Sequence, residues 1–292
     1  MGITKQKTIK IVVTGANGQL GKCIQDIAVQ YSDYDFHFKS SKELDITSKS
    51  QINSLFTQEK FGYCINCAAY TAVDKAESDQ ENAFLVNAEA VRYLAEACKA
   101  QNTILIHIST DFVFDGSKTT PYSEEDVPNP INVYGASKLK GEQYVQQLLK
   151  KYFIIRTSWV YSEYGHNFVK TMLRLGKESK EISVVNDQIG SPTYAGDLAG
   201  IIMKVVDSKE SSYGLFHYSY EGEISWFDFA TSIFEIKRMN VKVKPIPSEA
   251  FPTLAKRPRF SVMDKSKITQ ALNLKIPYWR DSLEKGIFII NN

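Results

Sequence analysis

The sequence lacks the features of several protein classes. No apolar run approaches the roughly 20 residues that a membrane-spanning helix needs. The net charge of the 292 residues is only +2, so the composition indicates neither a nucleic-acid nor a membrane-surface partner. The opening segment MGITKQKTIK is polar and basic, without the apolar stretch of a secretory signal. We therefore expect a cytoplasmic protein.

Cysteine is scarce, with four residues in the chain. Cys64 and Cys67 form a C-x-x-C spacing, which in other settings holds a metal ion or a redox disulfide. The surrounding segment FGYCINCA is typical of a buried strand, on which residues three apart face opposite sides. We therefore predict two buried, unpaired thiols. Cys23 and Cys98 lie in helical patterns and are expected to be small core residues.

The first 158 residues show a regular alternation of strands and helices. Apolar runs predict five strands, and amphipathic segments between them predict helices. This alternation is typical of an α/β fold with a Rossmann-like, doubly wound parallel sheet. The predicted strands are 9–13, 35–38, 63–67, 103–109 and 153–157, and the predicted helices are 19–31, 48–60, 81–101 and 137–152.

After residue 158 the pattern is less regular. Residues 167–179 and 195–207 are predicted to be helical and 182–185 to be a strand, and scattered prolines from 245 onward indicate short, irregular segments. We expect a Rossmann domain at 1–158, to which 181–207 returns. Residues 159–292 are expected to form a smaller C-terminal α/β lobe.

A glycine-rich turn joins the first predicted strand to the first predicted helix. In VVTGANGQLG (12–21), Gly15, Gly18 and Gly21 are three residues apart. Gly15 permits a tight turn, Gly18 lets a pyrophosphate approach the helix N-terminus, and Gly21 allows close helix packing. The spacing differs from the G-x-G-x-x-G of many dehydrogenases. We predict a dinucleotide site at this turn, and a glycine turn without a ligand is the alternative.

The second predicted strand ends without the acidic residue that commonly binds the ribose of NAD. The segment FHFKSSKELDIT places Lys39 and Lys42 there instead. A cation at this point suits a 2′-phosphate, which favours NADPH, with NADH as the alternative. Both lysines could equally be solvated loop charges. Asp45 is too far along the chain to bind the ribose, but it could meet the adenine.

A Y-x-x-x-K pair supplies candidate acid–base chemistry. Tyr134 and Lys138 are expected to share one face of a helix, where the ammonium lowers the pKa of the phenol from its ordinary value of about 10. The segment HISTDFVFDG ends the fourth predicted strand. Thr110 in this segment can hold a substrate oxygen while Tyr134 delivers a proton. Simple strand capping is the alternative for Ser109 and Thr110.

Taken together, these motifs resemble the extended short-chain dehydrogenase/reductase superfamily and, within it, the dTDP-4-dehydrorhamnose reductases. The matching segments span nearly the whole chain: GANGQLG, NCAAYTAVDKAES, STDFVFDG, PINVYGASKLKGE, RTSWVY, NFVKTM, DQIGSPTYAGDLA and RPRFS. The resemblance implies NADPH-dependent reduction of the C4 keto group of dTDP-4-dehydro-L-rhamnose, the last step of dTDP-L-rhamnose synthesis. It assigns NAD(P) to the first domain and the sugar nucleotide to the smaller lobe.

The resemblance also implies residue roles. Tyr134 would protonate the carbonyl oxygen, Lys138 would lower the pKa of that phenol and bind the nicotinamide ribose, and Thr110 would polarise the carbonyl. Thr110, Asp111 and Trp159 are the implied sugar contacts. The implied cofactor contacts are Gly15, Asn17, Gly18, Gln19, Leu20, Asp45, Ile46, Ala68, Ala69, Tyr70, Thr71, Tyr134 and Lys138.

Two positions depart from the family pattern. Phe112 stands where the family often has Tyr, so a hydroxyl near the substrate is lost. Some members use glutamates for a magnesium-linked dimer, and Cys23 occupies the place of one of them. We therefore predict no metal site. We expect a monomer or homodimer that binds a dTDP-sugar but neither nucleic acid nor membrane.

Two other functions share these motifs. One is a different nucleotide-sugar reductase, epimerase or dehydratase of the superfamily. The other is a non-catalytic regulatory subunit like that of methionine adenosyltransferase, which has this fold and works as a binding partner. The intact set of Thr110, Tyr134, Lys138 and Trp159 favours catalysis.

Overall fold

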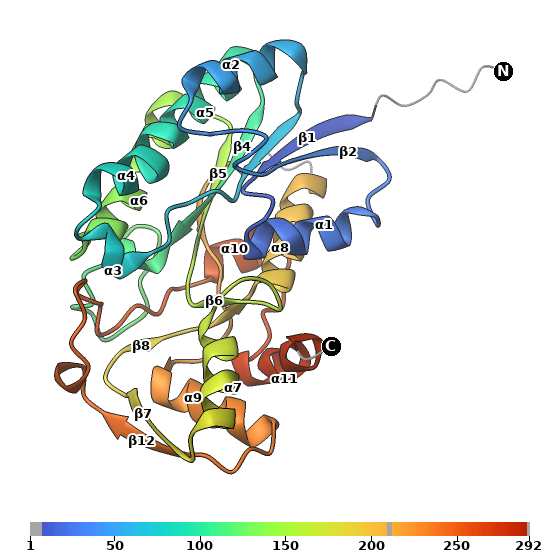
Figure 1. Cartoon of the computed structure of the whole chain (residues 1–292). Coiled ribbons are helices and arrows are strands. Elements are labelled where there is room, and N and C mark those ends of the chain that lie inside the picture. Colours follow the sequence, from blue (N-terminus) through green and yellow to red (C-terminus); the bar gives the residue numbers. More distant parts are fainter. Residues whose placement is uncertain (1–7, 209–211, 291–292) are drawn as a thin grey trace.

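A parallel six-stranded sheet with helices on both faces forms the upper part of the molecule in Figure 1. The computed structural model describes residues 8–208 and 212–290. The strand order is β10-β5-β4-β3-β1-β2, and every neighbouring pair is parallel. This confirms the predicted doubly wound α/β fold. The strands are β1 (Ile9–Thr14), β2 (Tyr34–Lys39), β3 (Tyr63–Asn66), β4 (Ile104–Thr110), β5 (Tyr152–Thr157) and β10 (Gly214–His217).

Alternating side chains of the strands divide the core into two layers. On β1, Ile11 and Val13 belong to one cluster of buried side chains, while Val12 belongs to the other. The first cluster includes side chains of α1 (Gln19–Ala28) and α8 (Ala195–Asp207). The second includes side chains of α2 (Lys49–Gln58), α5 (Ala90–Gln101) and α6 (Val133–Leu148). The strands are therefore apolar on both faces, as a parallel sheet covered by helices requires.

The ends of α6 differ from the predicted ones, and its capping residue and backbone angles explain why. Helix α6 begins at Val133 rather than 137, because the Asn132 side chain caps it by accepting a hydrogen bond from the Gly135 backbone N–H at 2.7 Å. It ends at Leu148 because Leu149 already has extended dihedral angles. The predicted cap of α2 is confirmed, since the Ser48 side chain accepts a hydrogen bond from the Gln51 backbone N–H.

The single helix predicted over 81–101 is three segments. Helices α4 (Gln80–Phe84) and α5 flank a π-helical turn, η1 (Leu85–Glu89). Helix α6 approaches this turn at Gly141, where an added Cβ would lie 2.2 Å from the Asn87 backbone oxygen. A π turn changes the helical period over only one turn, so the apolar pattern of the sequence did not reveal it.

A smaller lobe lies below the main sheet in Figure 1. Its helices are α7 (Phe168–Glu178), α9 (Trp226–Ile236) and α11 (Trp279–Ile290), beside a two-stranded sheet of β7 (Glu181–Val185) and β12 (Lys242–Ile246). The segment 181–207 was expected to return to the first domain. Its helix α8 packs on α1 of that domain, whereas its strand β7 pairs with β12 of the lobe. Strand β10, which the sequence did not predict, adds to the main sheet instead. The domain boundary at residue 158 remains a prediction.

Several short elements complete the described chain. They are α3 (Val73–Ala76), η2 (Asp111–Val113), β6 (Val160–Tyr161), β8 (Ile189–Gly190), β9 (Thr193–Tyr194), β11 (Ile224–Ser225), η3 (Ser248–Ala250) and α10 (Ser266–Ala271).

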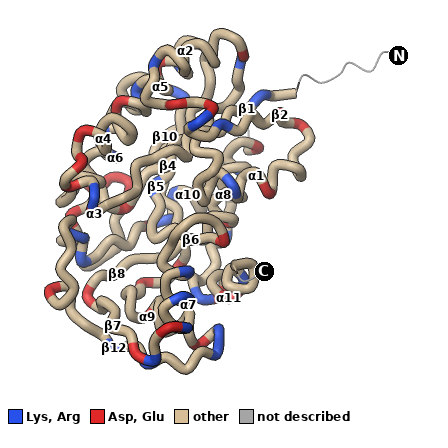
Figure 2. The backbone as a smooth tube through the Cα atoms, in the orientation of Figure 1, with Lys and Arg blue, Asp and Glu red and all other residues tan. Residues whose placement is uncertain are grey.

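The cysteines are unpaired, as predicted, but one of the two thiols predicted to be buried is not fully buried. All four thiols are free, and Cys64 and Cys67 lie on opposite core layers, with Cys64 buried and Cys67 half-buried. Lys, Arg, Asp and Glu are interspersed along the whole fold (Figure 2). Among the residues that the structure describes, no helix has both the length and the apolar character needed to cross a membrane.

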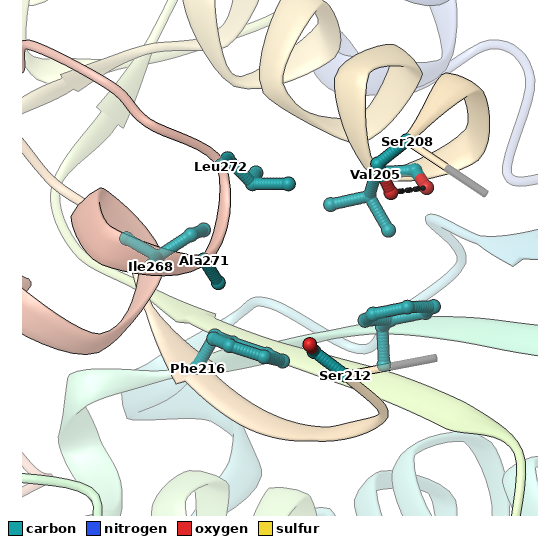
Figure 3. Close-up of a pocket in the computed structure, with 8 residues that line it drawn as sticks. Val205, Ser208, Ser212, Phe216, Ile268, Ala271 and Leu272 are labelled. Atoms are coloured by element: carbon teal, nitrogen blue, oxygen red, sulfur yellow. Dashed lines mark hydrogen bonds between the residues drawn. The ribbon is translucent and has the colours of Figure 1, made fainter. Parts of the chain in front are cut away.

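A small gap in the packing lies between α8, α10 and β10. Figure 3 shows this cavity, whose volume is about 10 Å³ and whose walls include Val205, Phe216 and Leu272. A space of this size holds one water at most, and the lining is apolar apart from Ser208 and Ser212. The cavity is therefore a packing gap rather than a ligand site.

Candidate active site

The glycine turn after β1 has the geometry that a close backbone approach requires. Gly15 has a φ of +65°, and an added Cβ there would lie 2.6 Å from the Ala68 backbone nitrogen. At Gly21 an added Cβ would lie 2.4 Å from the Gly15 backbone oxygen. Gly18 caps α1 without a side-chain hydrogen bond. The first turn of α1 is therefore packed tightly against the loop, with its N-terminus uncovered by a capping side chain.

A cavity of about 310 Å³ opens beside this turn. The segments after β2 and β3 and one residue of η1, Val86, supply the rest of its lining, at the carboxyl edge where ligands bind in open α/β sheets. The cavity thus brings together many of the predicted cofactor contacts. Those that line it are Gly15, Asn17, Gly18, Asp45, Ile46, Ala68 and Ala69.

The other predicted cofactor contacts lie elsewhere. The Gln19 side chain accepts hydrogen bonds from Ser162 and Asn167, and Leu20 is buried in the core. The Tyr70 backbone N–H and carbonyl are both hydrogen-bonded to the Asn87 side chain on η1. Thr71 is exposed on the same segment.

The segment after β2 lies next to the glycine turn. The Lys39 carbonyl accepts a hydrogen bond from the Ala16 backbone N–H at 3.2 Å. The Lys39 side chain is half-buried and that of Lys42 is exposed. Glu43, the nearest carboxylate on the chain, accepts hydrogen bonds from the Ser40 backbone N–H and hydroxyl. Both lysines thus lie on a segment that borders the cavity, and the 2′-phosphate interpretation remains a prediction.

The three predicted catalytic residues converge at the carboxyl end of β4. Thr110 is buried there, and its hydroxyl donates to Asp111 Oδ1 at 3.0 Å and accepts from the Phe112 backbone N–H at 3.2 Å. The Thr110 hydroxyl is close enough to the Tyr134 phenol to lower the pKa of that phenol. Lys138 lies one helical turn further on α6, and its Nζ donates to the Ile108 backbone oxygen at 2.6 Å. The predicted helical Tyr–Lys pair therefore lies against the strand that carries Thr110.

Burial controls the ionisation of this pair. Burial and, to a smaller extent, the charge of Asp111 raise the pKa of Tyr134 to about 12, against the opposing effect of the Thr110 hydroxyl. Burial lowers the pKa of Lys138 to about 8, against the opposing effect of Glu142. The expected lowering of the Tyr134 pKa by Lys138 is thus not what the structure shows, because the cost of a buried phenolate is larger. At neutral pH the phenol is protonated and able to donate its proton.

Asp111 is a buried carboxyl group next to this pair. It is 2% exposed, and burial raises its pKa to about 6. The hydroxyls of Ser261 and Thr110 oppose that shift. Since buried carboxyl groups are costly to ionise, its place beside the Thr110–Tyr134 contact marks it as a functional candidate.

Trp159, predicted to contact the sugar, is held by groups from two elements. Its backbone has a φ of +48°, which is uncommon for a bulky side chain. Its indole stacks on that of Trp226 of α9. Gly190 lies against the same ring, and an added Cβ at Gly190 would be 2.7 Å from Trp159 Cε2. The indole is therefore fixed where the main sheet meets the lobe.

A second cavity, of about 380 Å³, opens near Tyr134. Its lining includes Phe112, whose ring packs edge-to-face on Tyr134 with centroids 5.9 Å apart. Trp226 and Phe168 add aromatic surface, and Arg257 adds a positive charge. This lining suits an organic ligand that also carries negative charge.

The predicted sugar contacts border this second cavity rather than line it. Two side chains that line the cavity, Phe112 and Trp226, adjoin the predicted sugar contacts. Phe112 directly follows Asp111, and Trp226 stacks on Trp159.

Known proteins of one family resemble this chain over nearly its whole length. The chain matches the family model described as the RmlD substrate binding domain over residues 9–290. It is 41% identical over 285 residues to the dTDP-4-dehydrorhamnose reductase of Aggregatibacter actinomycetemcomitans, which covers 94% of this chain and 97% of that protein. It is 39% identical over 291 residues to the dTDP-4-dehydrorhamnose reductase of Sinorhizobium fredii, covering 97% and 98%.

The chain belongs to the RmlD family. A crystal structure of dTDP-4-dehydrorhamnose reductase from Bacillus anthracis in complex with NADP matches it with a TM-score of 0.93 and 45% identity, over 96% of this chain and 99% of that one. The fold extends beyond the RmlD family. A UDP-glucose 4-epimerase structure from Thermotoga maritima has a TM-score of 0.84 at 17% identity, a likeness of fold alone.

In this RmlD-family chain, Asn87 is a site residue that the sequence analysis missed. It lies on η1, accepts from the Tyr70 backbone N–H at 2.8 Å, and donates to the Tyr70 backbone oxygen and to Ser137 Oγ, each at 3.0 Å. A buried amide with three such bonds ties the segment after β3 to α6. One asparagine within a helical pattern gave no signal of this role, since its partners are distant in the chain.

The RmlD-family member also gathers three possible ligand groups that the sequence did not suggest. Ligand atoms of Cys23, Asp26 and Glu163 all lie within 4.8 Å of one another. Tyr164 donates to Asp26, and Tyr194 donates to Glu163. Burial raises the pKa of Cys23 to about 12, so its sulfur is a neutral thiol and a weak ligand. The prediction that the protein needs no metal remains to be tested.

Proposed function

We propose that this protein reduces the C4 keto group of dTDP-4-dehydro-L-rhamnose with NADPH to give dTDP-L-rhamnose. The observation that carries the proposal is the placement of Tyr134. Its phenol is buried and is influenced by the Thr110 hydroxyl at the carboxyl edge of the sheet, and its ring packs on Phe112, which lines the second cavity. The activity named for relatives at 41% and 45% identity supports the substrate.

The cavity beside the glycine turn fits a dinucleotide. The absence of side chains at Gly15 and Gly18 lets phosphates approach the N-terminus of α1. Leu44 and Ile46 offer apolar surface for a planar ring, and Ser41 is polar. When bound there, NADPH supplies the hydride that the reduction needs.

The residues around Tyr134 supply the proton. The phenol, protonated at neutral pH, donates to the C4 oxygen of the substrate, so the ketone becomes a secondary alcohol. The Thr110 hydroxyl orients that oxygen by hydrogen bonding. The Lys138 ammonium, on the same helix face, favours the phenolate that remains after donation.

The second cavity supports a sugar nucleotide. A nucleotide diphosphate carries negative charge, which the Arg257 guanidinium can meet. In the structure Arg257 Nη2 donates to Asp74 Oδ2 at 2.7 Å, so the cation is already fixed at the cavity wall. Phe112, Trp226 and Phe168 provide aromatic surface for the base or the apolar face of a deoxy sugar.

The test is to follow NADPH absorbance with a panel of 4-keto-6-deoxy sugar nucleotides and to identify the products by NMR. We expect steady oxidation with dTDP-4-dehydro-L-rhamnose and formation of the 4-hydroxy product. Tyr134→Phe is the matched control for the proton donor. Interconversion of sugars without net NADPH loss would indicate an epimerase. Cofactor binding without turnover of any keto sugar would favour a regulatory subunit.

A further inference from the structure

A buried ion pair joins the helix of Tyr134 and Lys138 to the neighbouring strand. Arg156 on β5 donates to Glu142 on α6 through Nε to Oε1 at 2.9 Å and through Nη2 to Oε2 at 2.6 Å. The two side chains are 2% and 1% exposed. Removing both charges from water is costly, so such a pair is weak evidence for stability alone. Its position suggests another role.

Arg156 is itself fixed on its other side. Its guanidinium lies over the Phe114 ring, 5.1 Å from the centroid, and its Nη1 lies 3.4 Å from His217 Nε2. Burial, and then the charge of Arg156, lower the pKa of His217 to about 3, so the imidazole is neutral. Its Nδ1 faces the Tyr122 backbone oxygen at 3.1 Å, which requires a proton on Nδ1 and leaves Nε2 as an acceptor. The pair therefore cannot rotate freely.

Glu142 continues the catalytic face of α6. Tyr134, Lys138 and Glu142 are four residues apart, the spacing that places side chains one above another on a helix. Lys138 is 2% exposed, and among the described residues its hydrogen bond goes to a neutral group, the Ile108 backbone oxygen. A buried ammonium with a neutral partner needs a negative charge nearby to remain protonated.

Two titratable groups face Lys138 from the sheet, and both are neutral. Burial lowers the pKa of His107 on β4 well below its usual range, and the charge of Lys138 lowers it further. Burial raises the pKa of the Cys67 thiol, which follows β3, well above its usual range. Neither group balances the ammonium at neutral pH.

On the helix side, two carboxylates act on two different groups. Tyr134 is neutral because its pKa is about 12, and the charge of Asp111 on η2 acts on this phenol. Glu142 is the carboxylate that opposes the effect of burial on the pKa of Lys138. Arg156 donates to both oxygens of Glu142 and so fixes the carboxylate.

We propose that Glu142 is a positioning residue for Lys138, whose buried ammonium it keeps charged while Arg156 fixes the carboxylate. The catalytic consequence rests on the proposed function, because Lys138 favours the phenolate left by Tyr134. The electrostatic part concerns the protein alone and can be measured without cofactor or substrate.

The test is a pH titration of Lys138 by NMR in protein carrying 13C-labelled lysine, with the resonance assigned through Lys138→Arg. Glu142→Gln leaves the Arg156 guanidinium buried without its partner and is expected to lose stability. The double variant Glu142→Met, Arg156→Met replaces the pair by apolar side chains, which buried sites often tolerate. We expect the Lys138 midpoint to fall by about one pH unit in either variant that folds. The alkaline limb of kcat/KM should fall with it.

Two further variants serve as controls. Glu142→Asp keeps the carboxylate and should retain a nearly wild-type midpoint. Glu89→Gln removes a carboxylate that accepts from the Tyr144 hydroxyl of the same helix at 2.9 Å. Glu89 is not among the groups that act on the pKa of Lys138, so this variant should leave the midpoint unchanged.

The outcomes separate the two proposals. An unmoved Lys138 midpoint in the folded double variant, with activity reduced by one factor at every pH, would overturn the role of Glu142 and leave the reductase activity standing. A wild-type protein that reduces no keto sugar would overturn the proposed function. The Lys138 titration would then still decide whether Glu142 holds the charge.

Discussion

The indole of Trp226 lies face to face with that of Trp159, with ring centroids 3.5 Å apart and planes 9° apart. Trp226 begins α9 in the lobe, whereas Trp159 follows β5 of the main sheet. Trp226 also lines the second cavity. A change at Trp159 therefore alters both its own surface and the support of a cavity wall.

Trp159→Ala is expected to raise the KM for the sugar nucleotide and leave the KM for NADPH little changed. The glycine-turn cavity draws its lining from the segments after β1, β2 and β3 and from η1, so this substitution lies outside it. Loss of one stacked aromatic should cost on the order of 1–3 kcal/mol, which lowers kcat/KM roughly 5- to 150-fold. Steady-state kinetics with each substrate varied would measure this, with Trp226→Phe as a milder control. An unchanged sugar KM with a melting temperature many degrees lower would make Trp159 a core residue only.

Tyr134→Phe is expected to lower kcat by about 10²- to 10⁴-fold, since it removes the proton donor. The phenyl ring keeps its edge contact with Phe112, so folding and NADPH affinity should be nearly unchanged. Stopped-flow or steady-state rates and a fluorescence titration of NADPH measure the two quantities. A variant with more than about a tenth of the wild-type kcat would remove Tyr134 from the acid role.

Asp111→Asn is expected to stabilise the protein at pH 7 while impairing activity. Burial raises the folded pKa of Asp111 from 3.8 to about 6. The folded state then binds the proton more tightly than the unfolded chain, so stability is greatest below about pH 4 and is lost as the pH rises through about 6. An amide avoids that loss, which is on the order of 3 kcal/mol at pH 7.

Thermal melts of wild type and Asp111→Asn over a pH series would check this sign. The variant should melt higher at pH 7, and the difference should shrink toward pH 4. A lower melting temperature at pH 7 would mean that the Ser261 and Thr110 hydroxyls favour the carboxylate more strongly than burial disfavours it.

Activity in excess EDTA is expected to equal activity with added magnesium. Of the three groups that meet near α1, Cys23 is a neutral thiol, and Asp26 and Glu163 each accept a hydrogen bond from a tyrosine. Metal removal should therefore leave the second cavity and Tyr134 undisturbed. Loss of activity that magnesium restores would show instead that this group binds an ion.

Local patterns in the sequence sufficed for the glycine turn and the Tyr134–Lys138 pair. The turn follows an apolar strand and opens a helix, so its three glycines predicted the close packing that Gly15 and Gly21 show. The Y-x-x-x-K spacing placed two side chains on one helix face, which the capped α6 confirms. In both cases the controlling contacts lie within a few residues of chain.

Long-range contacts and burial were beyond such patterns. Strand β10 is four residues long, too short for a period to show, and its place beside β5 depends on the whole intervening lobe. The stack of Trp226 on Trp159 joins segments far apart in the sequence. The direction of the Tyr134 pKa shift was predicted wrongly because a sequence shows the neighbouring lysine but not the depth of burial.

The position of β10 has a consequence for synthesis of the chain. Strand β5 ends at Thr157, but its outer neighbour begins only at Gly214. Once the ribosome has released the chain through β5, the edge of β5 opposite β4 therefore stays open until the lobe and β10 have followed. Open edges of this kind recruit other strands, so the growing polypeptide is most prone to misassociate during this interval. Slowing translation between these two strands should lower the yield of native protein more than slowing it after His217.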